Sequence, residues 1–268
     1  MIGAIVGDIV GSRFEMKNCK SYDFDLFDKW CSFTDDTVMT LAVAKTIMSC
    51  GGNYERLSEM AIKNMKAIGR AYPDCGFGGM FESWIFSSSS EPYNSFGNGA
   101  AMRVSPCGWV AKTEEDAKIL SRRVTEITHN HPEGIKGAEA TTLAIFMCRN
   151  GASKAEVKER IESDYYILDF TVDDLVKNYR FDGSCQGTVP QAVFAFLESK
   201  SFEDTIRIAI SFGGDSDTLA AIAGSIAEAY YGVDEHIEKE AITYLDTGML
   251  KVYCKWKLLS SSRRSQEE

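Results

Sequence analysis

The sequence predicts an all-α protein, and three observations carry this prediction. Apolar residues recur at steps of three and four residues through most of the chain, a spacing that places them on one face of a helix. Strand signals are scarce, and the best of them, Tyr165–Phe170, is weak. Glycines separate the apolar segments and do not form the dipeptides typical of hairpin turns. We therefore expect one domain of about ten helices within the 268 residues.

The first helix is expected at the start of the chain, where Gly3, Gly7 and Gly11 lie four residues apart and share one face. Glycine inside a helix costs about 1 kcal/mol relative to alanine. Three glycines on one stripe therefore indicate that another backbone or a ligand comes close, and helix packing is the simpler explanation. They do not form the G-x-G-x-x-G pattern and no strand precedes them, which argues against a Rossmann dinucleotide site.

Nine further segments keep the apolar spacing of a helix: 36–50, 54–68, 114–128, 132–149, one opened by residue 153, 189–199, 203–211, 217–231 and 235–245. Gly51 and Gly52 end the first of these segments. Pro132 opens another, because proline is favoured in a first helical turn. Ser153 and Glu156 have the spacing of a capping box, which predicts a helix start at that point.

The composition excludes several classes of protein. A count of 29 Lys and Arg against 39 Asp and Glu gives a net charge of −10, which argues against strong nucleic-acid binding. No apolar run approaches the roughly 18 residues of a membrane span, and the first residues lack the basic segment of a signal peptide. The eight cysteines stand at least 12 positions apart, so they offer no zinc clip and fit reduced thiols in a cytoplasmic protein. Residues 260–268 are interpreted as a flexible tail, which leaves 1–259 as the domain.

Two short acidic motifs, at 33–37 and 213–218, stand at predicted helix starts. Their oxygen-bearing side chains include four carboxylates and two threonine hydroxyls: Thr34, Asp35, Asp36, Asp215, Asp217 and Thr218. Helix capping is the alternative explanation, because Thr and Asp accept hydrogen bonds from the free N–H groups of a first turn. Capping needs one acceptor, whereas each motif holds two carboxylates within three residues, and these repel each other unless a cation neutralises them. If both helix starts converge, they form a two-metal site of the oxygen ligands that Mg²⁺ prefers.

Two segments between the acidic motifs are candidates for ligand binding. Gly97–Asn98–Gly99 at a helix start can aim backbone N–H groups at a phosphate, although Asn-Gly is also a common turn signal. His129 and His131 stand one residue apart in a chain with only three histidines, and they can bind a metal or hydrogen-bond a sugar. The alternative is that both are ordinary polar residues, since no cysteine lies nearby to complete a zinc set.

Five segments of the chain together resemble the ADP-ribosylglycohydrolase family, which includes ADP-ribosylarginine and ADP-ribosylserine hydrolases and the dinitrogenase reductase-activating glycohydrolase. The resemblance covers nearly the whole chain and is carried by residues 3–15, 33–37, 95–103, 128–138 and 212–232. The two acidic motifs, in this order and with the Gly-Asn-Gly and histidine segments between them, make it specific. The resemblance implies an orthogonal all-α bundle of the ADP-ribosylglycohydrolase type with two Mg²⁺ ions, sometimes Mn²⁺, in a cleft.

The resemblance also implies roles for individual residues. The metal ligands of the family match Thr34, Asp35, Asp36, Asp215, Asp217 and Thr218. The loop that binds the diphosphate and a ribose matches Ser95, Phe96, Gly97, Asn98 and Gly99. Glu15 matches a glutamate beside the metals and the cleaved bond, and His129 matches a histidine that contacts the ligand.

The activity implied is that of a Mg²⁺-dependent hydrolase, which removes ADP-ribose from an acceptor by cleaving the bond at C1″ of the distal ribose. Glu15, Asp35 and Asp36 are the candidates for acting on the water or holding the positive charge of the sugar ring, and the sequence leaves these roles open among them. The acceptor stays open between arginine, serine, a nucleobase and a small molecule. A monomer is the default state.

Two alternatives come from other functional classes. A catalytically silent ADP-ribose-binding or structural relative, like the lens crystallins of the family, would have lost metal ligands, whereas all six positions are kept here. A metal-dependent phosphohydrolase on an unrelated helical fold would need more histidines than the three in this chain. Release of free ADP-ribose, and not of phosphate, would separate the hydrolase from both.

Overall fold

The computed structural model describes the backbone of residues 1–267 and the side chains of residues 1–260. Over this range the protein is all-α, as predicted, and contains no strand. The α-helices are α1 (Ile2–Ser12), α2 (Asp35–Cys50), α3 (Leu57–Gly69), α4 (Gly79–Phe86), α5 (Ser105–Val110), α6 (Glu114–Thr125), α7 (Pro132–Arg149), α8 (Lys154–Asp164), α9 (Val172–Asn178), α10 (Cys185–Glu198), α11 (Phe202–Ser211), α12 (Ser216–Tyr231), α13 (Glu235–Ala241) and α14 (Thr247–Glu267). Two short 3-10 helices are η1 (Asn98–Ala100) and η2 (Ile242–Tyr244).

Each predicted helix is present, with ends that differ by a few residues. The helix predicted from Val189 begins earlier, at Cys185, because the Ser184 side chain caps it by accepting a hydrogen bond from the Gly187 N–H. The capping box predicted at Ser153 and Glu156 is confirmed. The sequence does not predict α4, α5 or α9, which have eight residues or fewer and are too short to display a helical period.

The weak strand predicted at Tyr165–Phe170 is wrong. This segment connects α8 to α9 without regular structure. It buries Tyr166 and Leu168 and exposes Ile167 and Asp169, so its side chains alternate with the period of a strand. Within residues 1–267, however, no other segment pairs with it. The side chains alternate because this extended connection packs one of its sides onto the core.

The C-terminal residues continue a helix that the sequence does not predict. α14 is polar along much of its length, which hides its period, yet its helical backbone runs through Glu267. The segment interpreted as a tail, 260–268, therefore overlaps this helix. Glu268 and the side chains after Ser260 lie outside the described residues, and the domain over 1–259 stays a prediction.

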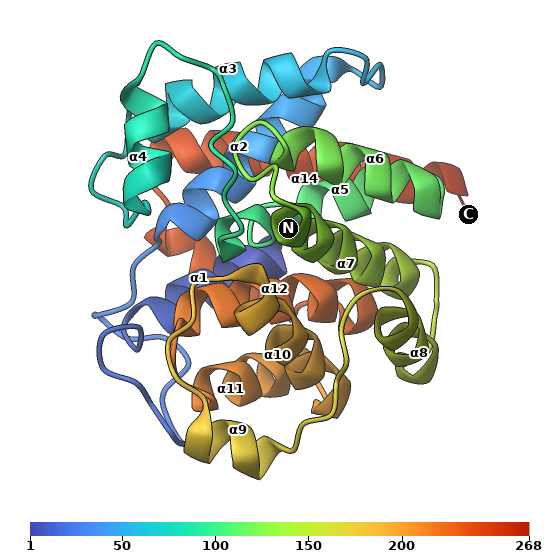
Figure 1. Cartoon of the computed structure of the whole chain (residues 1–268). Coiled ribbons are helices and arrows are strands. Elements are labelled where there is room, and N and C mark those ends of the chain that lie inside the picture. Colours follow the sequence, from blue (N-terminus) through green and yellow to red (C-terminus); the bar gives the residue numbers. More distant parts are fainter. Residues whose placement is uncertain (268) are drawn as a thin grey trace.

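The centre of the fold is the pair formed by α1 and α12 (Figure 1), and α12 also packs against α7, α10 and α11. A Cβ atom added at Gly3, Gly7 or Gly11 would overlap the backbone of α12. The facing position Gly224 is equally close to the backbone of α1. The glycine stripe is therefore explained by helix packing, and it holds the end of α1 against Asp217 at the start of α12.

The buried apolar side chains form a core cluster that draws on helices from α1 to α14. This core leaves the N-terminal ends of α2 and α12 facing the cleft described below. Among the helices that the structure describes, none is both long enough and apolar enough to cross a membrane.

Candidate active site

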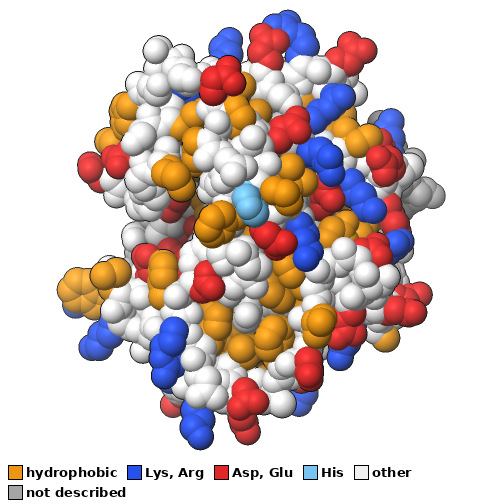
Figure 2. Space-filling model, in the orientation of Figure 1, with side chains coloured by type: hydrophobic (Ala, Val, Ile, Leu, Met, Phe, Trp, Pro, Cys, Tyr) orange, Lys and Arg blue, Asp and Glu red, His pale blue; other side chains and the backbone are white. Residues whose placement is uncertain are grey.

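A cleft of about 790 Å³ opens where α2 and α12 begin. Its lining residues come from seven parts of the chain: 12–15, 32–36, 74–81, 93–103, 129, 181–183 and 215–218. The space-filling view shows the molecule hollowed at its left edge, with acidic side chains inside the hollow (Figure 2). Nearly all residues proposed from the sequence meet in this one cleft, although they are spread along the chain from Glu15 to Thr218.

Asp8 is a site residue that the sequence analysis missed. It lies on α1, is 0% exposed, and faces the first acidic motif. Its carboxylate accepts hydrogen bonds from the Thr34 N–H at 2.9 Å, the Thr34 hydroxyl at 2.6 Å and the Thr37 N–H at 3.0 Å. Asp8 thereby fastens the start of α2 to α1. A carboxylate inside an apolar, glycine-striped helix is the sequence signal that would have found it, because a buried charge needs partners.

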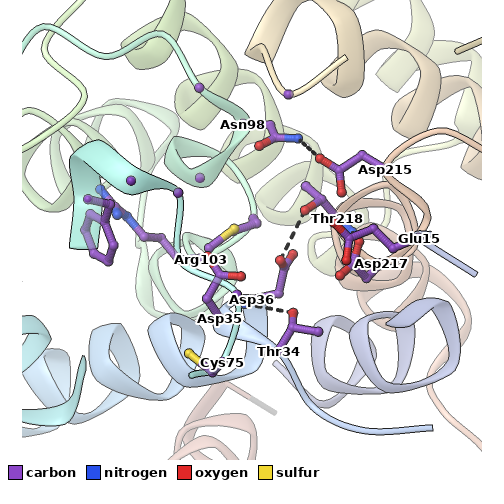
Figure 3. Close-up of a pocket in the computed structure, with 18 of the residues that line it drawn as sticks. Glu15, Thr34, Asp35, Asp36, Cys75, Asn98, Arg103, Asp215, Asp217 and Thr218 are labelled. Atoms are coloured by element: carbon purple, nitrogen blue, oxygen red, sulfur yellow. Dashed lines mark hydrogen bonds between the residues drawn. The ribbon is translucent and has the colours of Figure 1, made fainter. Parts of the chain in front are cut away.

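The two acidic motifs converge, as the sequence predicts for a shared site (Figure 3). The Thr218 hydroxyl donates a hydrogen bond to Asp36 Oδ2 at 3.1 Å, which joins the start of α12 to the start of α2. Carboxylate oxygens of Asp8, Asp36 and Asp217 lie within 4.8 Å of one another. A second group within the same limit combines Glu15, Asp215 and Asp217.

Hydrogen bonds to first-turn N–H groups account for part of each motif, since Asp217 Oδ1 accepts from the Thr218 N–H at 3.0 Å. Thr34 Oγ1 accepts a hydrogen bond from the Asp36 N–H at 3.4 Å, the bond of an N-cap, and also donates to Asp8. Asp215 occupies the N-cap position of α12, but its side chain makes no capping bond. Its carboxylate instead accepts from Asn98 Nδ2 at 2.7 Å. Asp215 therefore faces the cleft and does not cap the helix end.

Burial and neighbouring negative charge raise the pKa of the clustered carboxyl groups. The pKa of Asp36 and that of Asp217 lie well above the ordinary value, mainly because both groups are buried. For the same reason, with Asp8 as the next cause, the pKa of Asp35 rises to about 8. Burial also raises the pKa of Glu15, and the charge of Asp215 adds to this shift.

The donor set of the cleft fits a hard divalent cation. Asp36 Oδ1 is buried and has no hydrogen-bond partner among the described residues, so this oxygen could coordinate a cation. The surrounding atoms are carboxylate and hydroxyl oxygens, which Mg²⁺ and Mn²⁺ prefer. A cation would offset the repulsion that raises the pKa values of these carboxyl groups. Asp35 belongs to neither three-carboxylate group; a Cβ added at Gly76 would lie 3.3 Å from its Oδ1.

The predicted ligand loop, 95–99, lines the cleft with one exception. Phe96 is 49% exposed and is not among the lining residues. Its ring packs edge-on against the His131 ring, with 5.3 Å between the ring centroids. Several donors of the loop are already engaged: the Gly97 N–H binds Ser95 Oγ, and the Asn98 N–H binds the Gly183 carbonyl. Those two N–H groups are therefore not aimed at a phosphate in this structure.

The two neighbouring histidines have different places. His129 is buried and lines the cleft. His131 caps α7 by accepting from the Glu133 N–H at 3.1 Å and does not line the cleft. The explanation as an ordinary polar residue therefore holds for His131 alone. Burial, followed by the charge of Arg103, lowers the pKa of His129 well below its usual value, so its ring is neutral.

The fold and the site define an all-helical protein with carboxylates from three segments around one cleft, and comparison with known proteins defines the family. The family model described as ADP-ribosylglycohydrolase matches residues 1–266. The chain therefore belongs to the ADP-ribosylglycohydrolase family, and the enzyme class predicted from the sequence is confirmed.

Individual relatives are distant but cover most of the chain. The chain is 26% identical to "ADP-ribosylhydrolase ARH3" of Xenopus tropicalis, over 88% of this chain and 87% of that protein. It is 24% identical to the Homo sapiens protein of the same name, over 88% and 85%. "ADP-ribosylarginine hydrolase Tri1" of Pseudomonas putida is 23% identical, over 90% and 73%. A solved structure titled "ADP-ribosylglycohydrolase-related protein complex" has the same fold, with a TM-score of 0.63, 22% identity, and coverage of 94% of this chain and 96% of that one.

Proposed function

We propose that the protein is a Mg²⁺-dependent hydrolase, with Mn²⁺ as an alternative ion, that releases ADP-ribose from an acceptor by cleaving the bond at C1″ of the distal ribose. The observation that carries the proposal is the pair of three-carboxylate groups that share Asp217. Membership of the ADP-ribosylglycohydrolase family supports the class of substrate. The names of the ARH3 and Tri1 relatives support a hydrolase and not a silent binding protein.

The two groups of carboxylates define where two ions would be held. Asp8, Asp36 and Asp217 form one site, and Glu15, Asp215 and Asp217 form the other. Thr34 and Thr218 supply hydroxyl oxygens beside the first site, since they hydrogen-bond Asp8 and Asp36. When bound, the ions would supply positive charge to ribose and water oxygens and lower the pKa of that water.

Two carboxylates of the chain would act on the sugar ring and on the attacking water. Cleavage at C1″ develops positive charge on the sugar ring, which nearby carboxylates stabilise. Asp35 lies in the cleft outside both three-carboxylate groups, so it is the candidate to stabilise the ring once bound cations lower its pKa. Glu15 is only partly buried and belongs to the second group, where it can accept a proton from a water that attacks C1″. The proton then passes to the leaving acceptor.

The ADP-ribose would lie against the loop 95–99 and His129. Asn98 of this loop contacts the carboxylates through Asp215. Asn98 Nδ2 donates to Asp215 Oδ2 at 2.7 Å and to Thr188 Oγ1 at 3.1 Å. This side chain therefore links the loop to the second carboxylate group. Such a link supports a position of the distal ribose at the carboxylates when the rest of the ligand lies on the loop.

The test of the proposed function is release of ADP-ribose from defined substrates. Enzyme freed of metal with a chelator is assayed on ADP-ribosylated arginine and serine substrates, with and without restored Mg²⁺. Free ADP-ribose that appears only with the metal supports the proposal. Release of phosphate would point to a phosphohydrolase, and binding of ADP-ribose without turnover would point to a silent relative.

Other properties predicted from the sequence accompany this proposal. We expect a monomeric, cytoplasmic protein that acts on an ADP-ribosylated protein or small molecule. The net charge of −10 argues against strong binding of nucleic acid.

A further inference from the structure

The Arg103 guanidinium is a buried cation next to the cleft that the proposed mechanism does not use. Arg103 is 0% exposed and is the only lysine or arginine among the described residues that line the cleft. It forms no ion pair with a carboxylate among the described residues, and its Nε has no hydrogen-bond partner there. Its guanidinium lies 5.4 Å from the Phe81 ring centroid. A buried charge without a counter-charge is costly, so the residue needs a function.

The hydrogen bonds of Arg103 lead to His129. Arg103 Nη2 donates to the Thr128 hydroxyl at 2.7 Å and lies 3.4 Å from His129 Nδ1. The Thr128 hydroxyl lies 2.8 Å from the same Nδ1. All three side chains are buried, with exposed fractions of 0%, 0% and 5%. Buried polar groups of this kind hold one fixed arrangement, because water cannot replace a lost partner.

These contacts select one tautomer of the His129 ring. A guanidinium only donates, so the Arg103 N–H occupies a lone pair of Thr128 Oγ1. The Thr128 hydrogen then points to His129 Nδ1 at 2.8 Å, since its other acceptor, the Thr125 carbonyl, is 3.4 Å away. Nδ1 therefore accepts, and the ring proton is on Nε2. A proton on Nδ1 would face the guanidinium. The Thr128 hydroxyl would then donate to the Thr125 carbonyl at 3.4 Å and no longer to Nδ1 at 2.8 Å.

The protonated nitrogen of His129 faces the ligand loop. A Cβ atom added at Gly99 would lie 3.3 Å from Nε2, and one added at Gly97 would lie 3.6 Å from it. Nε2 therefore faces the space that these glycines leave open. The N–H groups of Gly97 and Asn98 and the Asn98 amide already bind protein acceptors. Nε2–H is therefore a further donor directed at a ligand on this loop.

We propose that Arg103 is a positioning residue: through Thr128 it fixes the Nε2–H tautomer of His129 and makes this nitrogen a hydrogen-bond donor to an oxygen of ADP-ribose. The identity of the ligand rests on the proposed function, whereas the tautomer does not. The low pKa of His129, caused by burial and by the Arg103 charge, keeps the ring neutral, so only one of its two nitrogens carries a proton.

The tautomer is measured by long-range ¹H–¹⁵N NMR of the imidazole rings in the ligand-free protein. The chain has only three histidines, so His131→Asn and His236→Asn assign the signals. We expect Nε2–H in the parent and in Thr128→Ser, which keeps the hydroxyl. Thr128→Val, of equal size, and Arg103→Met are expected to populate Nδ1–H. Thr125→Val is the matched control, because the Thr125 hydroxyl is buried and has no partner among the described residues.

Calorimetry of ADP-ribose binding provides the second readout. We expect Thr128→Val to weaken binding about 10-fold, the loss of one hydrogen bond, while Thr128→Ser and Thr125→Val stay within about 2-fold. An Nδ1–H parent, or a Thr128→Val variant with unchanged tautomer and affinity, overturns this inference alone. A parent that binds no ADP-ribose overturns the proposed function and the donor role together, even where the NMR result is as expected. Melting temperatures show that each variant is folded.

Discussion

The Thr218 hydroxyl and Asp36 Oδ2 form a hydrogen bond of 3.1 Å between residues 182 positions apart in the sequence. This bond joins the starts of α12 and α2, and both helices direct their N-terminal ends at the same cleft. Helix N-termini favour negative charge, which offsets part of the repulsion among the carboxylates gathered there. The hydrogen bond therefore holds both helix starts, with their carboxylates, at one cleft.

Asp217→Ala is expected to abolish metal-dependent hydrolysis, because Asp217 belongs to both three-carboxylate groups. The loss of kcat/KM should exceed the roughly 10–100-fold found for residues that only support metal ligands. ADP-ribose release with Mg²⁺ is the measurement, and Asp25→Ala, at an exposed position, is the control. Full activity of the Asp217 variant after chelation and return of Mg²⁺ would refute the metal assignment.

Glu15→Gln keeps the size and hydrogen bonding of the side chain and removes its charge. A general-base role predicts a loss of about 10²–10⁴-fold in kcat with ADP-ribose affinity largely kept. Single-turnover rates together with calorimetry separate the two quantities. A kcat within a few-fold of the parent would leave Asp35 and Asp36 as the remaining candidates.

Gly99→Val is expected to weaken ADP-ribose binding by more than about 10-fold, because its side chain would enter the space between the loop and His129. Gly99→Ala adds only a Cβ, 3.3 Å from His129 Nε2, and should have a smaller effect. Both variants are compared by calorimetry and by melting temperature. Equal affinity in a folded Gly99→Val variant would exclude the loop from the ligand site.

The stability of the metal-free protein is expected to fall as pH rises. A carboxyl group whose pKa is raised in the folded state binds its proton more tightly when folded, so its contribution to stability is full below the unfolded pKa near 4 and is lost as pH rises through the folded pKa. For Asp35 that folded pKa is about 8. In chelator, the melting temperature should therefore be higher at pH 6 than at pH 8.5.

Mg²⁺ should raise the melting temperature more at pH 8.5 than at pH 6, because its ligands must be deprotonated. Asp36→Asn removes one of the buried titrating groups and should flatten the dependence measured in chelator. A melting temperature that rises with pH in the absence of metal would contradict the raised pKa values.

The sequence predicts the helices well where a helix is long and one of its faces is apolar. It does not predict short helices, and it does not show whether an extended segment pairs with another strand. α4, α5 and α9 are too short to show a period. The alternating segment at 165–170 has the period of a strand, but sequence alone does not show that nothing in the described chain pairs with it.

The residues of the candidate site likewise differ in how far the sequence alone predicts them. The acidic motifs are visible because two carboxylates in one turn are unusual, and Glu15 is supplied by the family resemblance. Asp8 shows in the sequence only as a lone carboxylate in an apolar helix, and its role depends on the start of α2 packing against α1, where the Thr34 N–H donates to it. The separate places of His129 and His131 are likewise set by the turn into α7, which directs one ring inward and uses the other as a cap.

The contact between α1 and α12 also governs when the site can exist during synthesis. α1 is complete at Ser12, whereas α12 is complete only at Tyr231. At ribosomal rates of roughly 5–20 residues per second, the apolar first helix waits on the order of 10–40 s for the surface that buries its glycine face. Closing so long a loop also makes this pairing a slow, late event. During that interval the glycine-striped face of α1 lacks its packing partner, and the carboxylates of the two helix starts come together only after α12 has been made.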